Sequence, residues 1–457
     1  MISITIISSC LASIYASILY NLLDGSQCIS TQPQLNSILD ITLGGVLQPS
    51  LVLTFLLLAY RNVNQSKRRV GRVTVAQAPR LQNQFIVMIF SLVLVTGFLL
   101  LHGLIMYMYY AFTADYIGTV EQSAIISFGY TLTNYCYYLI NVVVTSLKWN
   151  ATGITVAGVT GVSDSTPDKL NQPTGLSIDS NGTLYIADQG NCRVQKWLSG
   201  APNGTTMVGQ PNATCGSGPS LLQSALGGLV DSNSNVYVVD TYNHRVQLWS
   251  YGASFGTMVA GTGFGGSANN QLYYPSGIEM NPTTGTLYVS DTWNHRIMSY
   301  LANTSSGTVV AGGNGPGTNS TQLYCPMGIY LDLTSNSLYI ANYYSHNIVY
   351  WVIGATSWTL VTGDINGMSG NSPTMLYCPY DVEVDYMGNI YVADSYNNRI
   401  QFFQAGSMNG TTIAGVTGVS GPDAYHLSYP VALKLDSQLN LYVTDCYNYR
   451  VQKFLHY

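Results

Sequence analysis

The segment LYIADQGNCRVQKWL, residues 184–198, recurs five more times in the chain without gaps. The other copies are VYVVDTYNHRVQLWS (236–250), LYVSDTWNHRIMSYL (287–301), LYIANYYSHNIVYWV (338–352), IYVADSYNNRIQFFQ (390–404) and LYVTDCYNYRVQKFL (441–455). Their shared tyrosines lie 52, 51, 51, 52 and 51 residues apart. A constant period of this length indicates a repeat architecture in which each copy forms the same structural unit.

Each copy is expected to contain four short strands. Five of the six copies begin with a proline and a short apolar run, as in PTGLSID at 173–179. The tyrosine segment and the Arg-Val-Gln segment alternate apolar and polar residues, as half-buried β-strands do. A run such as TMVAG at 257–261 supplies the fourth strand. Four strands per copy are typical of a propeller blade. The predicted fold is therefore an all-β six-bladed propeller over residues 151–457, with a linear β-solenoid as the alternative.

The phase of the repeat predicts how the ring closes. ITVAG at 154–158 has the sequence of a fourth strand, whereas the chain ends in a third strand at 451–457. We therefore expect 154–158 to pair with the last blade, which would remove two exposed sheet edges.

The pattern PxG…LYVADxxNxRVQxF resembles the NHL repeat family. This resemblance implies a six-bladed propeller of NHL type that binds proteins, RNA or small ligands. The fourth copy departs from the pattern, since Asn342 replaces the aspartate and Asn347 the arginine. Residues 151–457 contain nine basic and seventeen acidic side chains, a net charge of −8. Because phosphate binding requires positive charge, we expect no nucleic-acid partner.

Residues 1–150 have a different composition. Four apolar segments occupy Met1–Leu23, Leu43–Tyr60, Phe85–Phe112 and Ala124–Leu147. About 20 apolar residues cross a bilayer as a helix. Arg61–Arg80 carries six of the sixteen basic residues and no acidic one, so the positive-inside bias places the loop 61–84 in the cytosol. The prediction is an α-helical transmembrane region of about four helices in the plasma membrane. The alternatives are buried helices of a soluble domain and, for the first segment, a signal peptide.

Part of this region is similar to helices four to seven of a rhodopsin-like G-protein-coupled receptor. Cys28 matches the cysteine of the second extracellular loop, Pro49 the proline of the fifth helix and Thr133–Lys148 the seventh helix. The resemblance implies a truncated receptor-like signalling protein as an alternative function. The sixth helix lacks the Cys-Trp-x-Pro motif, and Asn141 is followed by three valines where Asn-Pro-x-x-Tyr is expected.

Five copies place an aspartate and an arginine five residues apart. These are Asp188 with Arg193, Asp240 with Arg245, Asp291 with Arg296, Asp394 with Arg399, and Asp445 with Arg450. Residues that recur in nearly every blade serve the blade itself. We expect the aspartate to cap the turn after its strand, and the arginine to pair with it or with a neighbouring blade. The alternative is a ring of charge that binds an anion or a metal.

Neither a metal nor a cofactor is predicted. His244, His295 and His346 occupy one motif position in three successive copies. Equivalent positions on blades do not converge on one point, as zinc ligands must. The alternative is a propeller hydrolase or lyase whose channel metal is held by unlike positions.

Two disulfides are suggested by the positions of the cysteines. Cys192 and Cys446 lie in the turns of the first and last blades, and Cys325 and Cys378 share the motif Tyr-Cys-Pro in adjacent blades. The predicted pairs are Cys192–Cys446 and Cys325–Cys378, with buried apolar filler as the alternative.

Aromatic residues recur at the turn that follows the tyrosine strand. They are Tyr242, Trp293, Tyr343, Tyr344, Tyr396 and Tyr447. We consider them candidate contacts for a protein or small-ligand partner, with packing between blades as the alternative. If all four apolar segments span the membrane, the propeller lies in the cytosol, and if the fourth does not span, the propeller lies outside. Seven Asn-x-Ser/Thr sequences and few lysines favour the extracellular alternative. The predicted function is a membrane-anchored, non-catalytic NHL-repeat propeller that binds a protein or another ligand.

Overall fold

The computed structural model describes residues 147–457. The predicted transmembrane helices, the cytosolic loop 61–84 and the receptor-like motifs lie outside the described residues. Within the described part, no helix combines the length and the apolar composition that crossing a bilayer requires.

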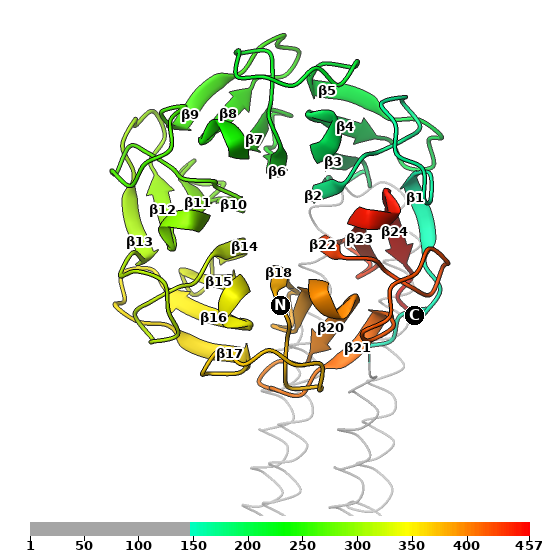
Figure 1. The fold of residues 1–457 in the computed structure, drawn as a ribbon, viewed down its shortest axis with the longest axis vertical. Helices are drawn as coiled ribbons and strands as arrows, with labels where there is room; N and C mark the ends of the chain where they lie inside the picture. Colours follow the sequence, from blue (N-terminus) through cyan, green and yellow to red (C-terminus); the bar gives the residue numbers. More distant parts are fainter. Residues whose placement is uncertain (1–146) are drawn as a thin grey trace, which may run out of the picture. The chain divides into compact units, whose positions relative to one another are not determined.

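Six four-stranded antiparallel sheets surround a common axis, so the predicted six-bladed propeller is confirmed (Figure 1). The first blade contains β2 (Pro173–Ile178), β3 (Leu184–Asp188), β4 (Arg193–Trp197) and β5 (Thr205–Gly209). The second contains β6 (Ala225–Val230), β7 (Val236–Asp240), β8 (Arg245–Trp249) and β9 (Thr257–Gly261). The third contains β10 (Ile278–Met280), β11 (Leu287–Asp291), β12 (Arg296–Tyr300) and β13 (Thr308–Gly312).

The remaining blades repeat this order. The fourth contains β14 (Pro326–Asp332), β15 (Ser337–Asn342), β16 (Asn347–Val352) and β17 (Thr359–Gly363). The fifth contains β18 (Pro379–Val384), β19 (Ile390–Asp394), β20 (Arg399–Phe403) and β21 (Thr411–Gly415). The sixth contains β22 (Pro430–Leu435), β23 (Leu441–Asp445), β24 (Arg450–Phe454) and, from the start of the propeller, β1 (Ile154–Gly158).

A short 3-10 turn joins the second and third strands of every blade and defines one face of the propeller, called here the turn face. The turns are η4 (Gln189–Asn191), η5 (Thr241–Asn243), η6 (Thr292–Asn294), η7 (Tyr343–Ser345), η8 (Ser395–Asn397) and η9 (Cys446–Asn448). Because the strands are antiparallel, the first-to-second and third-to-fourth connections lie at the other end, called here the opposite face. The long connections between blades also lie at the turn face, because the fourth strand of one blade ends there and the first strand of the next blade begins there.

The apolar residues form one core at each junction between blades. Between the first and second blades, for example, Tyr185 and Val194 pack with Val238 and Trp249. Between the sixth and first, Val451 packs with Ile186 and Trp197. Each blade therefore needs both neighbours to bury its two faces, which explains why the sheets occur as a ring.

The ring closes as the phase of the repeat predicts. Strand β1 pairs antiparallel with β24, with Ile154 opposite Lys453 and Ala157 opposite Val451. Figure 1 shows β1 at the outer edge of the blade that holds the C-terminal strands. The closed ring leaves no blade at an open end, so the solenoid alternative is wrong.

A glycine ends the fourth strand of every blade. In the first blade Gly209 has φ 80°, and a Cβ there would lie 2.5 Å from the carbonyl oxygen of Cys192. The strand can approach the end of the 3-10 turn this closely only without a side chain.

Closure through β1 predicts a position-dependent effect of charge. Ala157 is buried in the junction core, whereas Thr155 on the same strand is exposed. We expect Ala157→Asp to destabilise the propeller by about 3 kcal/mol, because it buries an unpaired carboxylate. Thr155→Asp should change stability by less than about 0.5 kcal/mol. Thermal unfolding of the full-length variants, followed by tryptophan fluorescence, measures both. Equal melting temperatures for the two variants would contradict the closure.

Candidate functional site

A buried carboxylate organises the turn face of each blade. In the first blade, Asp188 Oδ1 accepts the backbone N–H of Asn171 at 2.7 Å. Its Oδ2 accepts Asn191 Nδ2 and Arg193 Nε, both at 2.8 Å. Asp188 is fully buried, so these bonds supply the partners that a desolvated carboxylate requires. We call this arrangement the Asp-Asn-Arg clamp.

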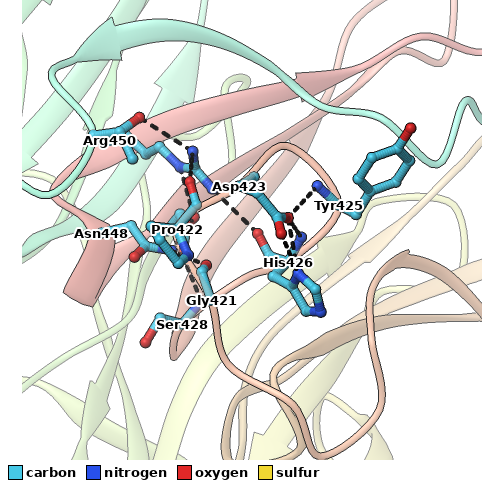
Figure 2. A network of polar contacts seen from close by, with 10 residues as sticks. Gly421, Pro422, Asp423, Tyr425, His426, Ser428, Asn448 and Arg450 are labelled. Atoms are coloured by element: carbon cyan, nitrogen blue, oxygen red, sulfur yellow. Dashed lines mark hydrogen bonds and ion pairs between the residues drawn. The ribbon is translucent and has the colours of Figure 1, made fainter.

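The clamp recurs with nearly constant geometry in the other blades that carry the motif. The Arg Nε to Asp Oδ2 distances are 2.8 Å in Arg245–Asp240, 2.7 Å in Arg296–Asp291, 2.8 Å in Arg399–Asp394 and 2.8 Å in Arg450–Asp445. Figure 2 shows the surroundings of Arg450, whose guanidinium donates to the carbonyls of Pro422, Asp423 and His426. The arginines therefore hold the connection between blades in place.

The aspartate does not cap the 3-10 turn, contrary to the expectation from sequence. Asp188 makes no side-chain bond to the N-terminus of η4. Its Oδ1 atom instead accepts the N–H of Asn171, two positions before the proline of its own blade, because the inner strand begins beside Asp188. The asparagine was missed as a third partner. The sequence could have indicated this partner, because an asparagine two residues before the arginine recurs in five copies.

The fourth blade builds a neutral version of the clamp. Asn342 Oδ1 accepts the Tyr324 N–H at 2.6 Å, and Asn342 Nδ2 donates to Asn347 Oδ1 at 3.2 Å. Both charges are absent together, so neither is left buried without a partner.

In the second to fifth blades, the residue that follows the 3-10 turn connects its blade to the next one. His244 Nδ1 accepts the N–H of Tyr274 at 3.2 Å, and Asn398 Oδ1 accepts that of Tyr429 at 3.0 Å. His295 and His346 make the same bond to the N–H groups of Cys325 and Cys378, at 3.2 and 3.1 Å. The histidines are therefore links between blades. Burial lowers the pKa of all three.

Both predicted disulfides are wrong. Cys192 occupies the linking position of the first blade and bonds to Cys215 in the next connection, with a Cα–Cα distance of 5.3 Å. Cys446 begins η9, a different motif position, and is free. Cys325 and Cys378 are also free, and both pack in one apolar cluster with Tyr343. Burial raises the pKa of the Cys325 and Cys378 thiols to about 12 and about 11.

Exposed aromatic side chains gather on the turn face, and we call them the aromatic arc. Its members, each between 38% and 53% exposed, are Tyr242, Tyr273, Trp293, Tyr324, Tyr344, Tyr377, Tyr396 and Tyr447. They extend over the second to sixth blades, while the first blade has Gly190 at the turn position. Five of the six aromatic candidates from sequence lie in this arc.

A repeated backbone bond places the arc rings in pairs. Trp293 N–H donates to the Tyr273 carbonyl, Tyr344 N–H to that of Tyr324 and Tyr396 N–H to that of Tyr377. The ring centroids of these pairs are 6.5, 5.2 and 4.9 Å apart. The second member of each pair was missed from sequence, although the motif Leu-Tyr-Tyr/Cys-Pro marks it in three copies.

Tyr343 is the exception among the aromatic candidates. It is the first residue of η7, whereas the exposed rings occupy the second position of their turns. The side chain is buried, and its hydroxyl lies 2.9 Å from the hydroxyl of Tyr429. Burial raises the pKa of Tyr343 well above its usual value. Tyr343 therefore packs between blades beneath the turn face, which is the alternative that the sequence left open.

The inner strands place one residue each at a common level of the central channel. These residues, each opposite the repeat tyrosine, are Ser177, Leu229, Glu279, Tyr330, Glu383 and Lys434. Lys434 Nζ contacts Glu383 Oε2 and lies 3.8 Å from Glu279 Oε1. The third and sixth blades are thus linked across the channel.

The channel carboxylates face an ammonium group that belongs to the protein. Burial raises the pKa of Glu279 to about 7 and that of Asp381 to about 6. Burial also lowers the pKa of Lys434, but Glu383, Glu279 and Asp381 outweigh this effect and hold it above its ordinary value. Within residues 147–457, no three His, Cys, Asp or Glu side chains are grouped to hold a metal ion.

Comparison with protein families agrees with this geometry. The family described as NHL repeat matches residues 170–197, 272–298, 376–403 and 427–454. These segments are the first, third, fifth and sixth copies. The propeller contains NHL repeats. The two copies outside the match are the second, which has Ala225 at the proline position, and the fourth, which lacks the charged clamp.

Individual relatives of the NHL propeller are distant. Protein SUPPRESSOR OF QUENCHING 1, chloroplastic, from Arabidopsis thaliana is 24% identical over 304 residues, which cover 61% of this chain and 24% of that protein. This chain thus spans about a quarter of the curated relative that it matches.

Two crystal structures from Bacteroides thetaiotaomicron share the fold. One, a structural genomics protein of unknown function, has a TM-score of 0.53 and 14% identity over 67% of this chain and 76% of that one. The other, described as an auxiliary nutrient binding protein, has a TM-score of 0.50 and 16% identity over 68% and 77%. At this identity the likeness concerns the fold alone.

The clamp of the NHL repeats predicts non-additive substitutions in the fifth blade. Arg399→Asn should cost about 3–5 kcal/mol, because it leaves the Asp394 carboxylate buried and unpaired. Adding Asp394→Asn reproduces the neutral fourth-blade pair and should recover at least about 1 kcal/mol. Lys169→Met at the exposed Lys169–Asp168 pair is the control and should cost less than about 1 kcal/mol. Additive losses in denaturant unfolding would refute the coupling.

The histidine links predict a pH-dependent stability. Each linking Nδ1 accepts an N–H and must be unprotonated, and burial lowers the pKa of the folded-state histidine. This stabilisation is fully present above the pKa of unfolded histidine and is lost as the pH falls through the lower folded-state pKa.

The test replaces His244, His295 and His346 together by asparagine, the linking residue of the fifth blade. From about pH 7.5 to about pH 5, the unfolding free energy should fall further in the native protein than in this variant. Buried Glu279 contributes the opposite slope, because its folded-state pKa is raised, but it is common to both proteins. Identical pH profiles would show that the histidines do not act as links.

Proposed function

We propose that the NHL propeller is a non-catalytic binding module that contacts a neutral partner through the aromatic arc. In this proposal the apolar residues 1–150 hold the module at a membrane. The exposed rings of the arc support the binding function, and the apolar sequence of residues 1–150 supports the membrane anchoring.

The single supporting observation is that the eight aromatic side chains of the arc are exposed on the turn face. Contiguous exposed apolar surface is unusual on a monomeric soluble protein and marks interaction sites. Tyrosine and tryptophan dominate the binding energy of many interfaces, because they offer large contact areas with few rotatable bonds. The three ring pairs are held by backbone bonds, so little ordering is needed when a partner binds.

The charge distribution indicates what kind of partner fits. The connections 210–224, 262–274 and 313–325 border the arc on the second to fourth blades and contain no Asp, Glu, Lys or Arg. They are rich in Asn, Gln, Ser, Thr and Gly. A partner with apolar surface and neutral hydrogen-bonding groups, such as a glycan or an uncharged peptide, matches this surface.

The channel supports the alternative of a hydrolase or lyase less well. The carboxylates Glu279 and Glu383 already share Lys434 as a partner, which extends between them. An incoming metal or substrate would have to displace this side chain and leave its ammonium without partners.

Removal of arc rings tests the proposal. Native full-length protein in lipid nanodiscs is screened against a panel of neutral oligosaccharides and uncharged peptides. For each ligand bound, the triple variant Trp293→Ala, Tyr344→Ala and Tyr396→Ala should weaken the affinity at least about tenfold, which corresponds to about 1.4 kcal/mol.

The control changes exposed rings on the opposite face. Tyr251→Ala with Phe255→Ala removes two strongly exposed side chains from the β8–β9 connection and should leave the affinity unchanged. The proposal fails if the triple variant binds as tightly as the native protein, or if the control variant is weakened equally.

A further inference from the structure

We propose that the propeller accepts N-linked glycans, mainly on the face opposite the aromatic arc. Residues 147–457 contain seven Asn-x-Ser/Thr sequences, at Asn150, Asn181, Asn203, Asn212, Asn303, Asn319 and Asn409. All seven asparagines are exposed in the folded propeller. None lies inside a strand, so the chain on either side can enter the active site of a transferase.

The acceptor nitrogens of these asparagines are free. Within residues 147–457 none of the seven donates a side-chain hydrogen bond. Asn150 and Asn212 use only their side-chain oxygens, which accept from Thr152 and Thr214. By contrast, the clamp asparagines donate through Nδ2, as Asn191 does to Asp188, and none of them is part of such a sequence. The asparagines that stabilise the fold are thus different residues from those whose side-chain nitrogens are free to accept a glycan.

A second observation points to the compartment in which this modification occurs. Cys192 and Cys215 form a disulfide at the junction of the first two blades, where other blades use a histidine or an asparagine as the link. Disulfides form and persist in oxidising compartments such as the lumen of the endoplasmic reticulum and the cell exterior. The same compartment supplies the glycan donor, a lipid-diphosphate-linked oligosaccharide.

The reaction at each site is a substitution at the anomeric carbon of the donor. The asparagine Nδ2 forms the bond to this carbon while the bond from the carbon to the diphosphate oxygen breaks. The lipid diphosphate leaves with the electron pair, and Nδ2 loses one proton to a base of the transferase. No oxidation or reduction takes place.

The topology distributes the sites unequally between the two faces. Asn181 lies in the β2–β3 connection, and Asn203, Asn303 and Asn409 lie in third-to-fourth-strand connections, all at the opposite face. Asn150 precedes β1 at the same end. Only Asn212 and Asn319 lie in connections that return to the turn face. Glycans at the five opposite-face sites would leave the aromatic arc uncovered.

The test uses the full-length chain expressed in eukaryotic cells. Peptide-N-glycosidase should increase the electrophoretic mobility of the membrane-bound protein. Partial digestion should give a ladder of bands that differ by one glycan each. Each single substitution by Gln, at Asn181, Asn203, Asn303 or Asn409, should remove one band from this ladder. Asn366→Gln is the matched control, because Asn366 is exposed but lies outside any Asn-x-Ser/Thr sequence, and it should leave the ladder intact.

Thiol labelling of the same sample reports folding and compartment independently of glycans. Cys192 and Cys215 should resist alkylation until the protein is reduced. A protein with no mobility shift overturns the proposal, whether or not the disulfide is present. A shift that persists after all seven asparagines are replaced by Gln together would equally overturn the assignment of these sites. Neither result bears on ligand binding by the arc.

Discussion

A carboxylate buried at the end of the second strand is the constraint on which five of the six blades depend. An ionised side chain without access to water is tolerated only with a full set of partners. Asp188 obtains them from Asn171, Asn191 and Arg193, which belong to three different segments. The same bonds fix the 3-10 turn, the outer connection and the start of the inner strand. In the third and fifth blades the backbone N–H held by the aspartate belongs to Tyr273 or Tyr377, so the clamp also positions rings of the arc.

The junctions between blades share an apolar core but use different polar links. A disulfide joins the first and second blades, histidines the next three junctions and Asn398 the fifth, while the pairing of β1 with β24 completes the sixth blade. A ring has no independent units, because each blade buries its faces against two neighbours. Variation among the polar links is therefore tolerated as long as the apolar core at each junction is kept.

The repeat separates residues that maintain the fold from residues that are free to differ. The interior positions keep the clamp or its neutral substitute, whereas the turn position beside it varies from Gly190 to Trp293. Exposed rings therefore accumulate on one face without a cost to the core. The opposite face carries Asx turns and most of the available asparagines, and the channel is occupied by an internal ion pair. The two faces thus offer different chemistry.

The sequence by itself determined the period, the number of blades, the strand order and the closure, because these follow from repeated patterns of neighbouring residues. It also indicated the partnership of Asp188 and Arg193 and five of the exposed rings, such as Trp293. The tertiary structure alone decided contacts between segments that no local pattern relates. It placed Cys192 opposite Cys215, buried Tyr343 against Tyr429 and brought Lys434 to Glu279 across the channel. The physical reason is that a repeat fixes each position within its blade, whereas partners in other blades depend on how the ring closes.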